Sequence, residues 1–234
     1  MLAARILKRI DLKRPMASLA LALALAAAVA VAGCAPSAPS STAQRTATPA
    51  PTATAAPRTL YQADFTQRAG EWTLPPHWSI ASGKLLNDGK GLNSITIPYL
   101  VTATSYTLTV QMRLIAINGS GYNNQYLFEG RSPAGKLLYT AGVNSLNQQN
   151  HGFSELYPAQ PDPQQNGNFG TADFTPGVNT RDYVVQVEGP YVVFLLSGGD
   201  IGMVKSATPL APARIVLLDQ TVQLEVESIK ITTP

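Results

Sequence analysis

The stretch SYTLTVQMRLIAI, Ser105–Ile117, alternates between apolar and polar side chains. The apolar set has one parity and the polar set has the other, as shown by Tyr106, Leu108, Val110, Met112 and Leu114 against Thr107, Thr109, Gln111 and Arg113. Because successive side chains of a strand point to opposite faces, this period of two predicts a β-strand with one buried and one solvated face.

The segments on either side show the same kind of pattern, separated by turn residues. Strand pairs are predicted in His77–Gly91, with a turn at Ser82-Gly83, and in Arg181–Asp200, with a turn at Gly189-Pro190. Two more strands are predicted in Ala213–Thr232, divided near Asp219-Gln220. No sustained helical period follows Cys34, so the folded part is expected to be all-β, as a sandwich or a closed barrel.

Several short motifs resemble the concanavalin A-like lectin/glucanase jelly rolls. They are the Asp64-Phe65 strand end, the Gly70–Trp72 turn, the Trp78-Ser79 strand with its Gly-Lys-Leu hairpin arm, and the closing strand VQLEVESIKITTP. The resemblance covers most of 60–234 and implies a two-sheet antiparallel jelly-roll sandwich over 58–234. Laminin-G-like modules, carbohydrate-binding modules, family 16 glucanases and 3-keto-disaccharide hydrolase-like domains share this scaffold, so it implies no single activity.

The N-terminus has the pattern of an export signal. A basic start is followed by the apolar run Leu19–Ala32, which at about 1.5 Å per residue falls short of a bilayer core of about 30 Å. The run ends in Val31-Ala32-Gly33-Cys34, which resembles the bacterial lipoprotein signal. The resemblance implies a signal peptide over 1–33, cleavage after Gly33, and acyl chains on Cys34 that hold the protein to the lipid bilayer. The expected location is the extracytoplasmic side of a membrane, at the cell surface or in the periplasm.

The segment after Cys34 reads as a linker. Residues 35–57 are almost entirely Ala, Pro, Thr and Ser, which cannot bury enough apolar surface to order themselves. The whole chain carries 17 basic and 14 acidic residues, but five of the bases and one acid precede Cys34. The remaining 12 bases and 13 acids give no argument for nucleic acid binding.

The sequence offers little for catalysis. Family 16 glucanases need several acids on one strand, and no such run exists here. The pair Glu225 and Glu227 is predicted to lie on a solvated outer face. A Ca²⁺ site formed by Asp64 with Glu227 is one alternative, and no other cofactor is expected. A zinc site has almost no ligands, since His77 and His151 are the only histidines.

Two regions are candidates for ligand binding. The segment 144–180 is rich in amides and carries His151 and Tyr157, which makes it one candidate for a binding rim, and the sandwich is expected not to depend on it. The alternative is that its aromatic residues only hold this loop against the sandwich. Upstream, the candidates are Tyr122, Tyr126 and Arg131, while Phe128 is expected in the core.

Three functions remain open. The leading hypothesis is a surface lipoprotein whose sandwich binds glycan or cell-envelope polymer without catalysis. The alternatives are a glycoside hydrolase of the 3-keto-disaccharide type and a structural or partner-binding module. Paired acids in the groove would favour the hydrolase, and an aromatic platform without them would favour the binding module.

Overall fold

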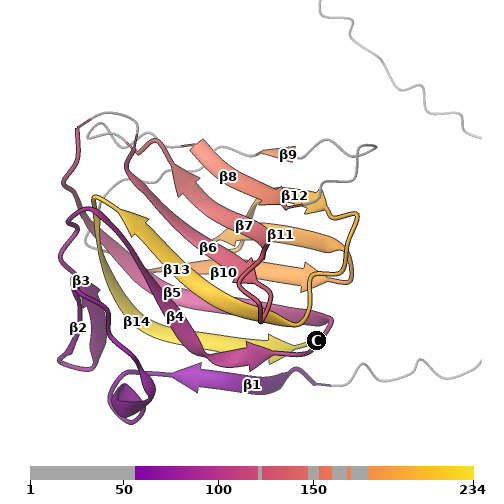
Figure 1. The fold of residues 1–234 in the computed structure, drawn as a ribbon, viewed down its shortest axis with the longest axis horizontal. Coiled ribbons are helices and arrows are strands. Elements are labelled where there is room, and N and C mark those ends of the chain that lie inside the picture. The colour runs from indigo at the N-terminus through magenta and orange to yellow at the C-terminus, as the bar shows by residue number, and fades with distance from the viewer. Residues whose placement is uncertain (1–55, 121–122, 147–152, 160–167, 170–178) are drawn as a thin grey trace, which may run out of the picture. The chain divides into compact units, whose positions relative to one another are not determined.

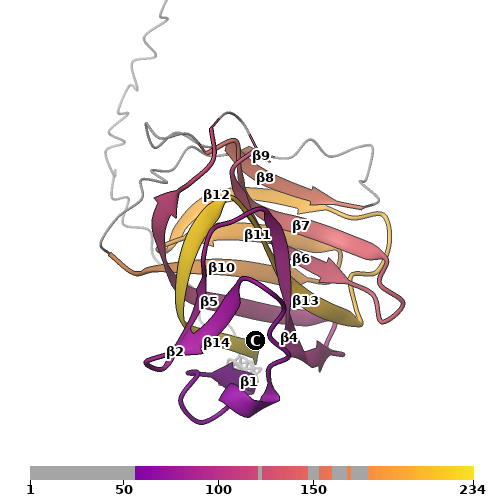
Figure 2. The ribbon, with the colours of Figure 1, turned by 60° about the vertical axis from the view of Figure 1, so that its left-hand side comes forward.

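The computed structural model describes residues 56–120, 123–146, 153–159, 168–169 and 179–234. These residues form two antiparallel β-sheets that pack face to face (Figures 1 and 2). This confirms the prediction of an all-β, two-sheet sandwich. The larger sheet contains nine described strands: β1 (Arg58–Ala63), β2 (Trp78–Ala81), β3 (Lys84–Asn87), β5 (Ser105–Ile117), β9 (Asn168–Phe169), β10 (Arg181–Glu188), β11 (Tyr191–Leu196), β12 (Gly199–Lys205) and β14 (Val222–Thr233).

The smaller sheet contains five described strands in the order β4-β13-β6-β7-β8. Their bounds are β4 (Leu92–Val101), β6 (Gln125–Arg131), β7 (Leu137–Asn144), β8 (Phe153–Pro158) and β13 (Ala213–Gln220). The described part also has a short 3-10 turn, Ala69–Glu71. None of its helices is long and apolar enough to cross a bilayer.

Strand β5 has the alternation that its sequence predicts. Its apolar residues from Tyr106 to Leu114 are buried, while Gln111 faces solvent. The strand lies between β14 and β10, so both of its edges are hydrogen-bonded and its long apolar face spans the core. The predicted hairpins at Ser82-Gly83 and Gly189-Pro190 are also present.

The core lies between the two sheets and contains a pair of tyrosines. The hydroxyls of Tyr106 on β5 and Tyr139 on β7 lie 2.8 Å apart, which joins the sheets through a buried hydrogen bond. The ring of Tyr139 occupies the space that a side chain on Gly130 would fill. Glycine is therefore required at this position of β6 by a close approach.

The last two strands belong to different sheets. Strand β13 pairs with β4 and β6, whereas β14 pairs with β1, β3 and β5. The chain crosses between the sheets at Thr221, which has a positive φ of 53° and whose carbonyl accepts from Asn118 N at 2.8 Å. Figure 1 shows β14 returning beside β1, so the two ends of the described β-structure are neighbours.

The prediction that the sandwich does not depend on 144–180 is wrong for part of that segment. Strand β8 pairs with β7 over Phe153–Pro158, and Leu156 is buried in the core. The two-residue strand β9 pairs with β12. The weak strand pattern over 152–157 lies where β8 forms, within an otherwise amide-rich segment.

Candidate functional site

The face of the five-stranded sheet that points away from the core carries the candidate site. We call it the five-strand outer face, and its members are Arg214, Val216 and Leu218 of β13, Leu127, Glu129 and Arg131 of β6, Thr140 of β7 and Tyr157 of β8. On β6 the alternate residues Tyr126 and Phe128 point into the core, which directs Glu129 outward.

Strand register brings four of these residues into one row. Val216 pairs with Glu129, Glu129 pairs with Thr140, and Thr140 pairs with Tyr157. Residues directly opposite on neighbouring strands have Cβ atoms about 4.5–5.5 Å apart, so their side chains are in reach of one another.

An ion pair lies near one end of this face, beside the β6–β7 turn. Arg131 donates from Nη2 and Nε to Glu129 Oε2 at 2.6 and 2.7 Å, and from Nη1 to the carbonyl of Gly135 at 3.3 Å. The carboxyl side is nearly enclosed, at 9% exposure, whereas the guanidinium is 38% exposed. The β6–β7 turn and Glu129 therefore hold Arg131 in one orientation with part of it open to solvent.

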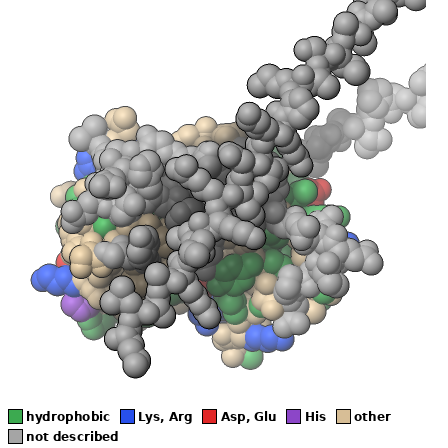
Figure 3. Space-filling view, turned by 90° about the horizontal axis from the view of Figure 1, so that it is seen from above, with side chains coloured by type: hydrophobic (Ala, Val, Ile, Leu, Met, Phe, Trp, Pro, Cys, Tyr) green, Lys and Arg blue, Asp and Glu red, His purple; other side chains and the backbone are tan. Residues whose placement is uncertain are grey.

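Much of this face is buried, since Leu127, Glu129, Thr140 and Val216 have little exposed surface, whereas Tyr157 and Arg214 are exposed. Thr140 is buried, and its hydroxyl has no hydrogen-bond partner in the described chain. Tyr157, its neighbour in the row, is 42% exposed. At the far end Gln125 donates to Gln220 at 3.2 Å. On the side of the molecule seen in Figure 3, described acidic side chains are few among polar and hydrophobic ones.

No protein-family model and no curated protein sequence matches this chain. Solved structures do match it. An endo-acting O-glycanase from the human gut microbiota aligns with TM-score 0.55 at 11% identity, covering 75% of this chain and 99% of the other. A Bacillus licheniformis β-glucanase gives 0.55 at 8%, covering 76% and 98%, and a galectin-like protein from Bacillus subtilis gives 0.52 at 10%, covering 75% and 97%.

The fold is that of the concanavalin A-like jelly rolls. At these identities the likeness concerns the fold alone. The chain spans nearly the whole length of each of these three structures, so the jelly roll is the complete unit that they share.

The predicted ligand residues have different fates in the jelly roll. Arg131 and Tyr157 lie on the same face, although they were proposed from separate regions. Tyr126 is placed wrongly as a surface residue, because it is fully buried with its ring edge-on to Tyr183 at 5.4 Å, and burial raises its pKa well above the usual value. Tyr122 and His151 lie outside the described residues.

Glu129 belongs to the candidate site, but the sequence analysis did not name it as a ligand-binding residue. It has the same parity as Arg131, two positions away, and that spacing is the signal by which an ion pair on one strand face could have been recognised.

The acids of the closing strand lie on the opposite, outer face of the nine-stranded sheet. Lys84 Nζ lies 2.7 Å from Glu225 and 3.2 Å from Glu227, and Arg113 lies 2.9 Å from Glu225. Hydrogen bonds from Lys84 to Glu225, and from Thr180 to Glu227, hold the pKa of each carboxyl below its usual value. This ion-pair network agrees with the predicted solvated face.

The two carboxylates proposed for Ca²⁺ have protein partners. Asp64 Oδ1 accepts from Thr66 N and Gln67 N at 3.1 and 3.2 Å, so it closes a turn. Glu227 accepts from Lys84 and Thr180. Within the described ranges, no three His, Cys, Asp or Glu side chains are placed to hold a metal ion. Ca²⁺ binding remains a prediction.

A second polar cluster lies where β13 ends. Asp219, expected in a turn, belongs to β13 and points into the sandwich, fully buried, and neither carboxyl oxygen has a hydrogen-bond partner in the described chain. Burial raises its pKa to about 7, and the nearby amides of Asn87 and Asn93 offset this only in part. Close by, His77 Nδ1 lies 3.0 Å from Asp88 Oδ2 beside an open cleft of about 380 Å³.

Proposed function

We propose that this protein binds a glycan without cleaving it, on the five-strand outer face of its jelly roll. The observation that carries the proposal is the placement of the oriented Arg131–Glu129 pair on the same sheet face as the exposed ring of Tyr157, with one strand between them. Guanidinium, amide and hydroxyl groups hydrogen-bond sugar hydroxyls, and an aromatic ring packs against the apolar face of a sugar ring. The proposal is supported by the structures that share this jelly roll, which include a β-glucanase and a carbohydrate recognition domain.

The carboxylates of this face favour binding over hydrolysis. Glycoside cleavage ordinarily needs two carboxyl groups about 5–10 Å apart. Among the described side chains of this face, Glu129 is the one carboxylate, and Arg131 already holds it. The outward positions of β7, next to β6, are Thr140, Gly142 and Asn144 and carry no acid.

A second candidate function is that of a glycoside hydrolase. One observation supports it, the position of a second acidic residue on this face. Glu155 occupies the position on β8 opposite Gly142, on the same parity as Tyr157. With strands about 4.8 Å apart and residues about 3.4 Å apart along a strand, the Cα atoms of Glu129 and Glu155 lie roughly 12 Å from each other. Hydrolysis requires the two carboxyl groups themselves to lie about 5–10 Å apart.

We also propose that acyl chains on Cys34 hold the jelly roll at the extracytoplasmic side of a membrane, with 35–57 as the connecting stalk. The support is the sequence Val31–Cys34 behind a basic and apolar run. Two or more acyl chains suffice for stable anchoring.

The test is a glycan array probed with the full-length chain in detergent. We expect retention of a defined glycan class, at least tenfold weaker in Tyr157→Ala and in Arg131→Ala, with Lys230→Ala on the opposite sheet face as the control. Equal binding by all variants would move the site elsewhere, and absence of any glycan ligand would favour a structural or partner-binding module. Turnover that is abolished by Glu129→Gln or by Glu155→Gln would establish the hydrolase.

A further inference from the structure

Two arginines face each other across neighbouring strands at one end of the five-strand outer face. Arg214 on β13 and Arg131 on β6 are direct partners in the strand register. Like charges placed directly opposite in an antiparallel pair destabilise a sheet. A negative charge close to the two guanidinium groups would relieve this repulsion.

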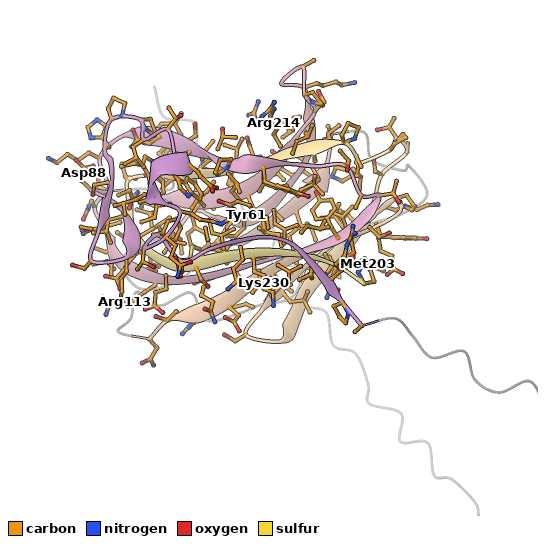
Figure 4. All side chains as sticks on the ribbon, turned by 90° about the horizontal axis from the view of Figure 1, so that it is seen from below. Tyr61, Asp88, Arg113, Met203, Arg214 and Lys230 are labelled. Atoms are coloured by element: carbon orange, nitrogen blue, oxygen red, sulfur yellow. The ribbon has the colours of Figure 1, made fainter. Side chains whose placement is uncertain are left out.

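The protein provides that charge for only one of the two arginines. Glu129 is bound to Arg131, whereas Arg214 is exposed and has no hydrogen bond or ion pair in the part of the chain that the structure describes. Figure 4 shows Arg214 projecting from the side of the sandwich opposite to Lys230. Half-buried Leu100 and Leu137 occupy the register positions that flank the two arginines.

Among the described residues, the other acids of this sheet are not placed to neutralise Arg214. Asp219 lies on the core side of β13, and the Glu155 position lies on β8, three strands away and two register rows along. Counted over the described residues, the open end of the face thus holds one more guanidinium group than carboxylate. Guanidinium groups present paired N–H donors that match the two oxygens of a carboxylate or sulfate group.

We infer that Arg214, with Arg131, forms a subsite for an anionic substituent, and that the ligand of this face is an acidic glycan carrying carboxylate or sulfate groups. This inference rests on the proposed function and adds to it the charge class of the ligand. One sugar of the glycan packs against the exposed ring of Tyr157, and the acidic substituent of another sugar in the same chain lies at Arg214, three strands away. Leu100 and Leu137 border the subsite with apolar surface.

The experiment compares matched acidic and neutral polymers against the full-length chain in detergent. Polygalacturonate is paired with its fully methyl-esterified form to test carboxylates, and dextran sulfate with dextran to test sulfates. We expect at least one acidic polymer to bind tenfold or more tightly than its neutral partner. Arg214→Gln should remove most of this preference and Arg214→Lys should keep part of it, because lysine retains the charge but not the paired donors. Lys230→Gln is the control for non-specific attraction.

The outcomes separate this inference from the proposed function. Equal binding of acidic and neutral polymers, with loss in Tyr157→Ala but not in Arg214→Gln, would overturn the acidic subsite and leave glycan binding in place. Loss of acidic binding in Lys230→Gln as large as in Arg214→Gln would also overturn it, since the attraction would then be general. Failure to bind any of the four polymers or any array glycan would remove both the proposed function and the subsite.

Discussion

At the scale of single residues, Asp219 has the least ordinary environment. A carboxyl group without a hydrogen-bond partner is disfavoured in its charged form when it is buried, which is why its pKa rises to about 7. Its position at the end of β13, on the inner parity shared with Ile215 and Leu217, gives the side chain no route to solvent.

The ionisation of Asp219 should make the free energy of unfolding depend on pH. Between about pH 4 and pH 7 the folded chain keeps this proton and the unfolded chain loses it, so the free energy of unfolding should fall as the pH rises through this window. Above pH 7 the Asp219 contribution is constant. Asp219→Asn should therefore raise the free energy of unfolding by about 2–3 kcal/mol more at pH 8 than at pH 5.

Denaturant unfolding of both chains at pH 5, 6, 7 and 8 measures this difference. Asp182→Asn, a change on the exposed side of β10, is the control and should run parallel to the wild type. A difference between wild type and Asp219→Asn that does not change with pH would show that Asp219 ionises normally.

Gly130 should be intolerant of a side chain. A Cβ atom there would overlap the ring of Tyr139, and the hydrogen bond between the Tyr139 and Tyr106 hydroxyls limits how far that ring can move. Gly130→Ala should destabilise the domain by about 1–3 kcal/mol, the usual range for overpacking. Gly70→Ala, where a Cβ meets no atom within 4 Å, should melt close to the wild type in a thermal melt. A normal melting temperature for Gly130→Ala would mean that the sheets separate readily at this point.

At the scale of elements, β8 serves the core with one face and the candidate site with the other. Leu156 is 1% exposed and its neighbour Tyr157 is 42% exposed. Leu156→Ala should lower the free energy of unfolding by about 2–3 kcal/mol, because it removes buried methyl groups from a packed core.

Tyr157→Ala should leave the stability almost unchanged while weakening glycan retention. Chemical denaturation beside a glycan pull-down, on both variants, separates the two roles of the strand. A large loss of stability in Tyr157→Ala would assign its ring to packing, and unimpaired retention would exclude it from the site.

At the scale of the whole molecule, the sequence predicts a signal and linker at the N-terminus, before the jelly roll. The five bases that make the chain's formal charge positive lie before Cys34, and the rest of the chain is close to neutral. The jelly roll therefore depends on local clusters, such as the arginines of the five-strand outer face, for any electrostatic attraction.

Replacing Cys34 by Ala should release the protein from the membrane, because the acyl chains have no other attachment site in this chain with a single cysteine. Detergent phase partitioning of the two proteins measures the effect. If Cys34→Ala stays in the detergent phase like the wild type, the apolar run 19–32 is itself the anchor.

Local pattern was sufficient for much of the fold. Alternation within 105–117, the Ser82-Gly83 turn and the paired strands near the C-terminus predicted an all-β sandwich, since strand periodicity and turn chemistry are properties of neighbouring residues. The same local signals predicted that Glu225 and Glu227 face solvent. The bacterial lipoprotein signal is likewise a local pattern, and it still awaits its test.

Only the tertiary structure decided which distant residues meet. Arg214 and Tyr157 belong to one face because β13 pairs with β6 and β8 with β7, and these pairings join segments far apart in the chain. Parity alone could not say which side of β6 is buried, so Tyr126 was misplaced and Glu129 was overlooked. A strand's alternation defines its two faces, but which of them is buried depends on the sheet packed against it.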